Sequence, residues 1–545
     1  MRIGAITGLL LLLGSAAQAA PEIIRPRLLS AVVEWPSAFA AVAKIEGLRP
    51  SPREKSEDVL RRLNAITAAH LPNVAASSVP VLLPFDTAAA LRDNGKPASN
   101  EPSNGEKYFF GFHSPRFLLT GPAGYEAAFT IYTSDIKELS DISLPDPVEI
   151  QVVGLGLYHE LDEQPTPEMR PVPALEAQFP GIRRMYVEGH LRYVFQRFGV
   201  PYVVSIDCFD GRPRLLRLIC TQADRIAVQF LNSLRVTGGT PQKAAAPIEP
   251  PLVVRPKITS PTFTYWGPGK IYPGSGFRSA NGRVDYTAYA PMRFPLEESP
   301  SYANSQIYRP HQPRGRSREA STTPSTDYAY PWRDNFCERR GFTVGQCPGG
   351  IGHQGQDLRP ELCRRPLGND RCDPAHNIVA VRSGAIMRSP KQEAVYIVIN
   401  TANEHIRFRY LHMEPSKMDE ENLLSWRDVR EGEVIGQVSN YSRKENGTSY
   451  HLHFDIQVPT KYGWVFVNPY MTLVTAYERL IGARGTEFSD TPELAEATED
   501  SGSNTARPAW AQPGDRRTRG RRVGVRDHGR EQHPNGQDTD RTPVE

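Results

Sequence analysis

The sequence has little of what marks membrane-embedded or nucleic-acid-binding proteins. After its N-terminal segment, no run among the 545 residues is long and apolar enough to span a bilayer, which requires roughly 20 residues. The formal net charge of +3 is small for this length and indicates no nucleic-acid partner. No internal repeat is visible either. We therefore expect a soluble mature protein with no stable membrane span and no bound nucleic acid.

Cysteine is scarce as well, with six residues and no CxxC pair, so the spacing does not fit a cysteine zinc cluster. The even number favours disulfides if the chain is exported to an oxidising compartment. Pairing between sequence neighbours is the simplest of the connectivities that six cysteines allow. It predicts the disulfides Cys208–Cys220, Cys337–Cys347 and Cys363–Cys372.

The first residues of the chain indicate export. They combine a positive charge at Arg2, an apolar run over residues 3–13 and the small-residue cleavage pattern Ala17-Gln18-Ala19. We interpret residues 1–19 as a signal peptide. An uncleaved membrane anchor is disfavoured because the apolar run is shorter than a bilayer span. A lipid anchor is disfavoured because no cysteine lies at the cleavage point.

Composition divides the rest of the chain into four parts, which predicts a multidomain protein. Residues 20–236 mix helical and strand-like runs and predict an α+β region of unknown role. Residues 237–286 are rich in glycine and proline and are interpreted as a linker and approach segment. Short strand-like runs dominate residues 287–485 and predict a mainly-β domain. Residues 486–545 hold few large apolar side chains and are expected to form a disordered tail.

Two short motifs carry side chains suited to metal binding. His353 and Asp357 lie four residues apart, and His451 and His453 follow about a hundred residues later. A catalytic zinc site commonly uses three His or carboxylate ligands and keeps a fourth position open for water. On a strand, His451 and His453 point to the same face with Cα atoms roughly 6 to 7 Å apart, while Phe454 points into the core. The pair can therefore supply one ligand and one group beside the substrate.

The order and spacing of these motifs resemble the LytM/lysostaphin (M23) family of zinc metallopeptidases. That family has an HxGxD motif, a middle histidine and an HLHF-type motif. In this chain they read His353-Gln354-Gly355-Gln356-Asp357, Arg409-Tyr410-Leu411-His412-Met413 and His451-Leu452-His453-Phe454. The resemblance covers about Arg293 to Met471, roughly a third of the chain. It implies that residues 287–485 are a LytM-like, peptidoglycan-cleaving peptidase domain.

The resemblance also implies a role for each residue. His353, Asp357 and His453 would hold one zinc ion (Zn2+) per chain, and His412 and His451 would be catalytic residues beside its open face. Zinc lowers the pKa of bound water from about 15.7 towards about 7. A histidine, with a pKa near about 6.5, can take the proton of this water and return it to the leaving amine. One of the two histidines does this and the other stabilises the oxyanion, and the sequence does not distinguish them.

The motifs do not decide the role of several polar residues and segments of the chain. Asp455 is either a carboxylate behind the metal ligands or a solvated side chain. Residues 359–376 form an insertion relative to the family, interpreted as a disulfide-pinned loop that shapes the substrate groove. Residues 446–450 lack the family's customary Gly-Pro dipeptide before the last motif. His159, Glu160 and His190 are interpreted as ordinary surface or core residues.

The expected function is therefore hydrolysis of the peptide cross-bridges of peptidoglycan by an exported zinc endopeptidase. A periplasmic enzyme acting on the D-Ala to meso-diaminopimelate bond is the natural expectation, and a secreted enzyme acting on glycine-rich bridges is its alternative. A LytM-like regulator of wall amidases is disfavoured, because such domains typically lack several of the five polar residues. A further alternative is that the N-terminal region is a wall-binding module. Wall hydrolases are the expected partner proteins.

Overall fold

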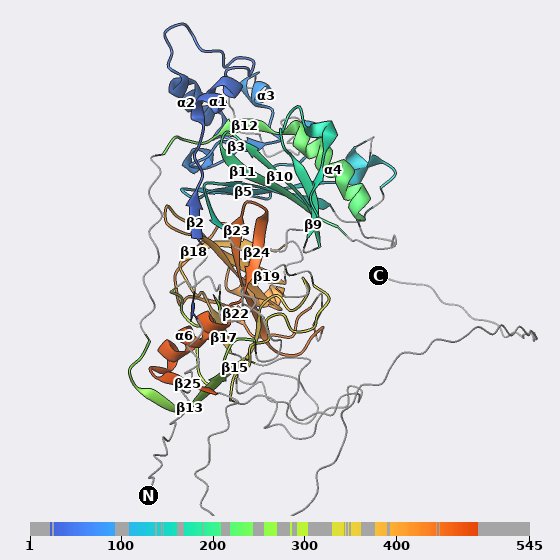
Figure 1. The fold of residues 1–545 in the computed structure, drawn as a ribbon. Helices are drawn as coiled ribbons and strands as arrows, with labels where there is room; N and C mark the ends of the chain where they lie inside the picture. The colour runs from blue at the N-terminus through green and yellow to red at the C-terminus, as the bar shows by residue number, and fades with distance from the viewer. Residues whose placement is uncertain are drawn as a thin grey trace, which may run out of the picture. The chain divides into compact units, whose positions relative to one another are not determined.

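Strands dominate the structure, a computed structural model, and several helices pack against them (Figure 1). The described residues all belong to one compact unit of the chain, residues 1–489. They are residues 22–23, 27–92, 108–136, 139–142, 144, 147–160, 168–187, 189–208, 218–242, 255–269, 284–285, 291–303, 330–342, 344, 347, 350–360, 376–389, 393–442, 444–445 and 447–488. The expected signal peptide, the expected Cys363–Cys372 pair and nearly all of the expected tail lie outside the described residues.

Residues 27–242, called the N-terminal region below, are built on a seven-stranded antiparallel sheet. Along β5, Tyr125, Ala127 and Phe129 belong to one apolar core, whereas Ala128 belongs to another. This alternation shows that both faces of the sheet are covered. In spatial order the strands are β4 (Phe117–Gly121), β5 (Gly124–Ile131), β6 (Val148–Leu155), β11 (Val200–Asp207), β10 (His190–Arg197), β9 (Arg183–Val187) and β8 (Arg170–Pro171).

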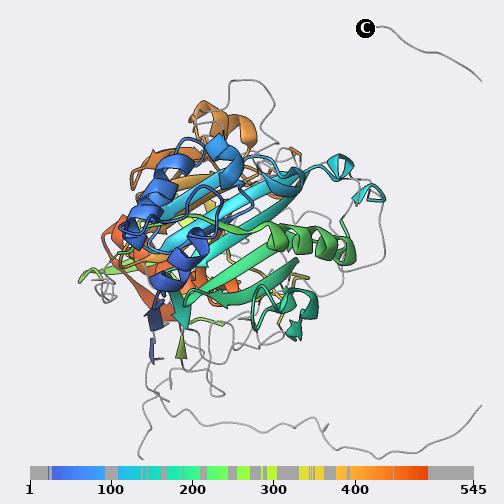
Figure 2. The ribbon, with the colours of Figure 1, turned by 90° about the horizontal axis from the view of Figure 1, so that it is seen from above.

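Helices cover one face of this sheet, as Figures 1 and 2 show. In α2, Val59, Leu60 and Leu63 form a buried stripe, and acidic residues in the first turn complement the helix dipole. The disulfide Cys208–Cys220, a confirmed prediction, ties the start of α4 to the residue after β11. No helix within the described residues is long and apolar enough to cross a membrane. The four helices are α1 (Trp35–Val42), α2 (Ser56–Thr67), α3 (Thr87–Arg92) and α4 (Cys220–Ser233).

Besides the antiparallel pair of Asn377–Val379 with Val434–Gln437, four pairs of short strands lie outside the two large sheets of the described residues. Of these four, two are antiparallel and two are parallel. One of the parallel pairs contains residues 259–266. Part of the segment interpreted as a linker therefore forms a strand. The antiparallel pairs are β3 (Val81–Leu83) with β12 (Arg235–Gly238), and β2 (Arg27–Ser30) with β7 (Leu157–Glu160); the parallel pairs are β13 (Thr259–Trp266) with β25 (Arg484–Phe488), and β1 (Glu22–Ile23) with β14 (Val284–Asp285).

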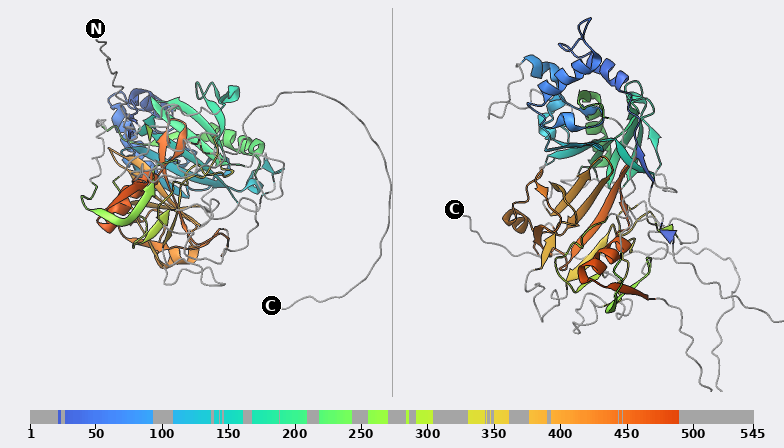
Figure 3. Two further views of the ribbon diagram at one scale, coloured as in Figure 1. Left: turned by 60° about the horizontal axis from the view of Figure 1, so that its bottom comes forward. Right: turned by 90° about the vertical axis from the view of Figure 1, so that its left-hand side faces the viewer.

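Residues 291–488, called the C-terminal region below, contain an eight-stranded sheet (Figure 3). Its path is β15 (Ser301–Ala303), β16 (Gln356–Pro360), β23 (Leu452–Thr460), β20 (His405–Leu411), β19 (Ala394–Asn400), β18 (Gly384–Arg388) and β21 (Asp428–Val429), with β24 (Gly463–Val467) against β23. The remaining elements are the pair β17 (Asn377–Val379) with β22 (Val434–Gln437), and the helices α5 (Pro415–Glu420) and α6 (Tyr470–Ile481). The β-rich character expected for this part of the chain is confirmed.

The second face of the N-terminal sheet packs against the C-terminal region. Strand β23 lies against β7, and Arg407 of β20 forms an ion pair with Glu126 of β5, Nη1 to Oε1 3.1 Å. Both side chains are nearly buried, at 11% and 2% exposed. Trp464 of β24 lies in an apolar cluster with Val153, Leu155, Met185, Val194 and Val203 of the N-terminal region. The contact is therefore an apolar core with a buried ion pair inside it.

Acid is expected to destabilise the protein through this contact. His405 is buried and its Nδ1 donates to the backbone oxygen of Leu157, 3.1 Å away. Burial lowers the pKa of His405 from its usual 6.5 to about 4. The unfolded chain therefore takes up a proton first as the pH falls, and about 3 kcal/mol of stability is lost between about pH 6.5 and pH 4.

Denaturant unfolding followed across this pH range tests the prediction. His405→Asn keeps a donor for Leu157 and is expected to flatten the acid limb, whereas His190→Gln, in another strand, is the control. An unchanged acid limb in His405→Asn would show that other groups cause the acid loss.

Candidate metal centre

Strand pairing brings the two sequence motifs together. In the antiparallel pair β16–β23, Asp357 lies directly opposite His453. In the pair β20–β23, Leu411 lies opposite the same residue, which places His412 one residue beyond. Five predicted site residues, taken from three distant segments, therefore meet at one end of β23, and four of them are buried.

His353, Asp357 and His453 form a tight triangle of ligand-type atoms. His353 Nε2 is 2.9 Å from His453 Nδ1 and 3.2 Å from Asp357 Oδ1, and the third edge, His453 Nδ1 to Asp357 Oδ1, is 3.4 Å. Ligands about 2.0 to 2.1 Å from a tetrahedral zinc ion lie about 3.3 Å from one another. The triangle therefore has the dimensions of three vertices of a zinc tetrahedron.

The outer nitrogen of each imidazole is held by an acceptor. His353 Nδ1 donates to the backbone oxygen of Asn335 at 3.0 Å, and His453 Nε2 donates to Asp455 Oδ2 at 3.2 Å. A carbonyl and an ionised carboxylate can only accept, so the protons of the neutral rings lie on these outer atoms. Two lone pairs then face each other across 2.9 Å inside the triangle. A cation between them satisfies both.

Asp357 is the negative member of the group. Its Oδ1 has no hydrogen-bond donor in suitable geometry, although three imidazole nitrogens, including His451 Nε2, lie within 3.4 Å. Burial alone would raise the pKa of Asp357, but the neighbouring His353 and His451 hold it well below its usual range. The carboxylate is therefore ionised, and the residues present fit a divalent cation.

His412 and His451 lie beside the triangle. Their ring centroids are 4.7 Å apart, and His412 is 6.3 Å from the ring of His453. The Nδ1 atoms donate to backbone oxygens of Tyr441 and Ser449, at 3.0 and 2.6 Å, which leaves Nε2 as the basic atom of each ring. Burial lowers the pKa of His412 to about 4 and that of His451 well below its usual value, so both rings are neutral at neutral pH.

His412 differs from the other four site residues in two respects. It is the one of the five that is half-buried rather than buried, so solvent can reach it. Its backbone also has a positive φ of 70°, in the left-handed region that residues other than glycine adopt uncommonly. The chain turns sharply at the end of β20 and thereby directs this ring to the site.

Asp455, left open by the sequence, is fully buried behind His453. Its Oδ2 accepts from His453 Nε2 and from Arg409 Nε, the latter at 2.5 Å, and its Oδ1 accepts from Gln457 Nε2 at 2.8 Å. Gln457 Oε1 in turn accepts from Arg407 Nε at 2.8 Å, and Arg407 pairs with Glu126 of the N-terminal region. We call Asp455, Gln457, Arg407 and Glu126 the backing chain. It links the metal triangle to the N-terminal region without a break.

The segment behind His353 is pinned by a disulfide. Cys337 pairs with Cys347, as predicted from their spacing. Cys337 N donates to the backbone oxygen of His353 at 3.0 Å, and His353 N donates to that of Glu338 at 2.9 Å. The disulfide therefore fixes the backbone that positions the first ligand. Motif analysis did not find Asn335 or Gln457 and gave no role to Arg409, although strand alternation from His453 through Asp455 indicates Gln457.

Replacing Asp455 by asparagine is expected to weaken zinc binding about 10- to 100-fold. The substitution keeps the size of the side chain but removes the charge that orients His453, and partners of this kind typically contribute that factor to metal affinity. Competition with a chromogenic chelator measures the affinity, with the exposed Asp428→Asn as the matched control. Equal affinities in the two variants would contradict this role for Asp455.

No family model and no curated protein matches the chain. Among solved structures, it is similar to a crystal structure from Ruminococcus gnavus ATCC 29149, provisionally described as the glycyl-glycine endopeptidase LytM. The identity is 20%, the TM-score is 0.18, and the match covers 25% of this chain and 50% of that one. The chain thus spans about half the length of that protein. A likeness of this degree carries no argument about activity, which has to come from the site itself.

Proposed function

We propose that the protein is a zinc-dependent endopeptidase that hydrolyses peptide cross-links of peptidoglycan. The observation that carries the proposal is the triangle of His353, Asp357 and His453, with two further neutral imidazoles beside it. The substrate class comes from the resemblance of the three motifs to the M23 family. An exported, periplasmic location is proposed from the N-terminal sequence, and the disulfides Cys208–Cys220 and Cys337–Cys347 are compatible with an oxidising compartment.

His353 Nε2, His453 Nδ1 and Asp357 Oδ1 would hold the zinc ion. When bound, zinc supplies a Lewis acid that polarises the scissile carbonyl and lowers the pKa of water. His412 and His451 each offer a basic Nε2, so either can accept the proton of the attacking water. The ring that has taken this proton becomes a donor on the same atom. It can then deliver the proton to the amide nitrogen as the carbon–nitrogen bond breaks. The other ring could stabilise the oxyanion only with a proton on its Nε2.

Digestion of cross-linked sacculi tests the proposal. The purified protein is incubated with sacculi alone, with a chelator, and with the chelator followed by either zinc or magnesium. Chromatography with mass detection should show cross-linked dimers falling and monomers rising, with loss of activity on chelation and recovery with zinc alone. The product masses distinguish cleavage at D-Ala to meso-diaminopimelate from cleavage within glycine-rich bridges.

An unchanged muropeptide profile with protein that still sediments with sacculi would refute the enzyme assignment. A regulator of wall amidases or a wall-binding module would then be the function to pursue. Addition of a wall amidase to the same incubation separates these two, because a regulator changes the amidase products and a binding module does not.

A further inference from the structure

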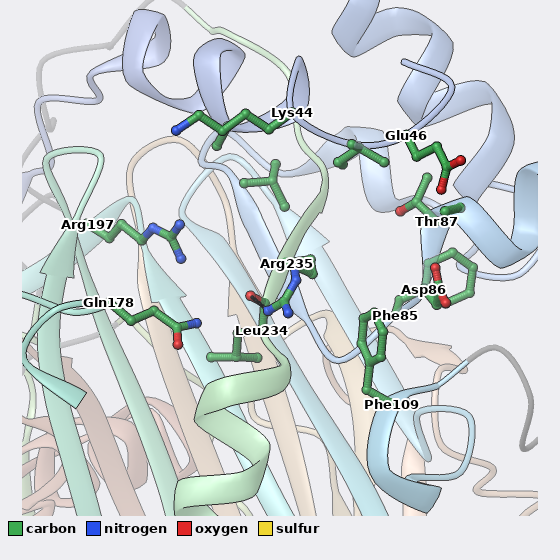
Figure 4. A pocket seen from close by; sticks show the side chains of 14 residues that line it. Lys44, Glu46, Phe85, Asp86, Thr87, Phe109, Gln178, Arg197, Leu234 and Arg235 are labelled. Carbon is green, nitrogen blue, oxygen red and sulfur yellow. Dashed lines mark hydrogen bonds between the residues drawn. The ribbon is translucent and has the colours of Figure 1, made fainter. Parts of the chain in front are cut away.

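The N-terminal region has a cavity of about 530 Å³ on the helix-covered side of its sheet. It lies between α1, the start of α3, the end of β10 and the junction of α4 with β12 (Figure 4). No residue of the C-terminal region lines it, so it is separate from the metal centre. The volume is within the range of small-molecule sites, about 300 to 1,000 Å³.

Three cationic side chains line this cavity, which we call the basic pocket: Lys44, Arg197 and Arg235. Figure 4 shows Lys44 and Arg197 on one side and Arg235 near the middle. The guanidinium of Arg197 stacks on Phe179 and Phe198, with Cζ 5.5 and 4.9 Å from the ring centroids, but its buried Nη1 has no hydrogen-bond partner.

Two carboxylates, Glu46 and Asp86, also line the cavity, but within the described residues no ion pair joins them to the three cations. Burial, together with the nearby charge of Arg235, lowers the pKa of Arg197. Arg235 Nη1 donates only to backbone oxygens of Asn232 and Leu234, at 2.8 and 3.0 Å, and its Cζ lies 5.2 Å from the ring centroid of Phe109. The half-buried Arg197 and the exposed Arg235 thus bring two positive charges to one cavity. An anion between them would be attracted by both.

The opposite side of the basic pocket carries a second polar group without a partner. Thr87 is 3% exposed, and its Oγ1 has no hydrogen bond; Figure 4 shows this oxygen turned towards the cavity. Asp86 lies beside it and uses Oδ1 to cap α3 through Ala89 N, 3.0 Å away. The floor between the two sides is apolar and contains Phe85, Phe109 and Leu234.

We propose that the basic pocket binds a small molecule with an oxyanion head, a carboxylate or a phosphate, and an apolar body with a hydrogen-bonding group at its far end. The oxyanion pairs with Arg197, Arg235 and Lys44, since guanidinium groups bind carboxylate and phosphate in forked geometry. The body lies on Phe85, Phe109 and Leu234. The far polar group reaches Thr87 and Asp86. A short peptide with a free carboxylate has all three parts. This inference does not depend on the proposed peptidase activity.

Titration calorimetry on the full chain tests the inference with three probes: the tripeptide L-Ala-D-Glu-meso-diaminopimelate, the same tripeptide with its carboxyl groups amidated, and inorganic phosphate. The metal site is kept loaded with zinc throughout, and the variants of the basic pocket distinguish binding there from binding at the metal. The variants Arg197→Gln and Arg235→Gln remove one guanidinium each. Arg61→Gln is the matched control, because Arg61 is an exposed arginine of α2 that does not line the pocket.

Binding of the tripeptide or of phosphate is expected, and each pocket variant should weaken it about tenfold or more, as loss of a hydrogen bond to a charged group predicts. Arg61→Gln should bind as the parent protein does. Loss of binding on amidation identifies a carboxylate ligand, and binding of phosphate alone identifies a phosphate ligand. Failure of both anions to bind tighter than about 1 mM, or binding that neither variant changes, overturns the inference.

Thermal unfolding without any ligand gives an independent readout. Arg197→Gln removes a like-charge repulsion and an unpaired buried donor, so its midpoint should equal or exceed that of the parent. An arginine with a purely structural role would show the reverse. A lower midpoint for both Arg197→Gln and Arg235→Gln, together with unchanged anion binding, would assign these residues to structure alone.

Discussion

Purified His453→Ala is expected to contain no zinc and to leave sacculi uncut. His453 Nδ1 lies 2.9 Å from His353 Nε2 and 3.4 Å from Asp357 Oδ1. Loss of this ring leaves only His353 and Asp357 as ligands. Two ligands do not hold a structural or catalytic zinc ion at the affinity of three. Formation of monomers from cross-linked dimers should fall by about a thousandfold or more, because every later step depends on the metal.

Metal analysis by mass spectrometry and muropeptide release measure the two quantities on the same sample. His405→Asn is the control, since it alters a buried histidine of the same region outside the centre. Activity that survives in His453→Ala without zinc would remove the metal from the mechanism. Full zinc content with no activity would instead show that His453 is not a ligand and that the triangle binds metal in another way.

The second large effect is expected when the two neighbouring imidazoles are replaced one at a time. His412→Asn and His451→Asn should each keep zinc and lower kcat by about 10²- to 10⁴-fold, the usual contribution of a general acid–base. Asparagine is chosen at position 412 because it tolerates the positive φ of 70° that the backbone has there. The loss of activity then reports the imidazole and not a rearranged turn.

The paired design separates the roles of the two residues. If the double variant is no slower than the slower single variant, the two histidines act in one proton-transfer step. If the effects multiply, they act on different steps. Loss of zinc in either variant would contradict the assignment, because it would make that histidine part of the metal site.

The sequence predicts the members of the centre better than it predicts what supports them. His353, Asp357, His451 and His453 sit in short motifs whose spacing is set by a single strand or turn, so local pattern is enough to find them. Their supports depend on which strands become neighbours. Arg409 reaches Asp455 only because β20 pairs with β23 in one register. The sequence around Arg409 contains nothing that indicates Asp455 as its partner.

The same limit applies to the wider fold. Strand-like runs in the sequence predict the strands of the N-terminal region. They do not predict which part of the chain covers the second apolar face of the sheet. In the sequence, Trp464 is an ordinary apolar residue of the short strand β24. Only the folded structure shows that it packs against Val153 and Val203 of the N-terminal region. The sequence does not predict the strand at residues 259–266, because its partner, β25, lies more than two hundred residues later and pairs in parallel.

The backing chain bears on how this protein could mature. Excision of the N-terminal region would remove the carboxylate that pairs with Arg407 and would open Trp464 and its apolar neighbours to water. Both changes are costly, and both act on strands that carry or flank the metal ligands. We therefore expect removal of the N-terminal region to weaken the strands that hold the metal ligands, which argues against a disposable propeptide.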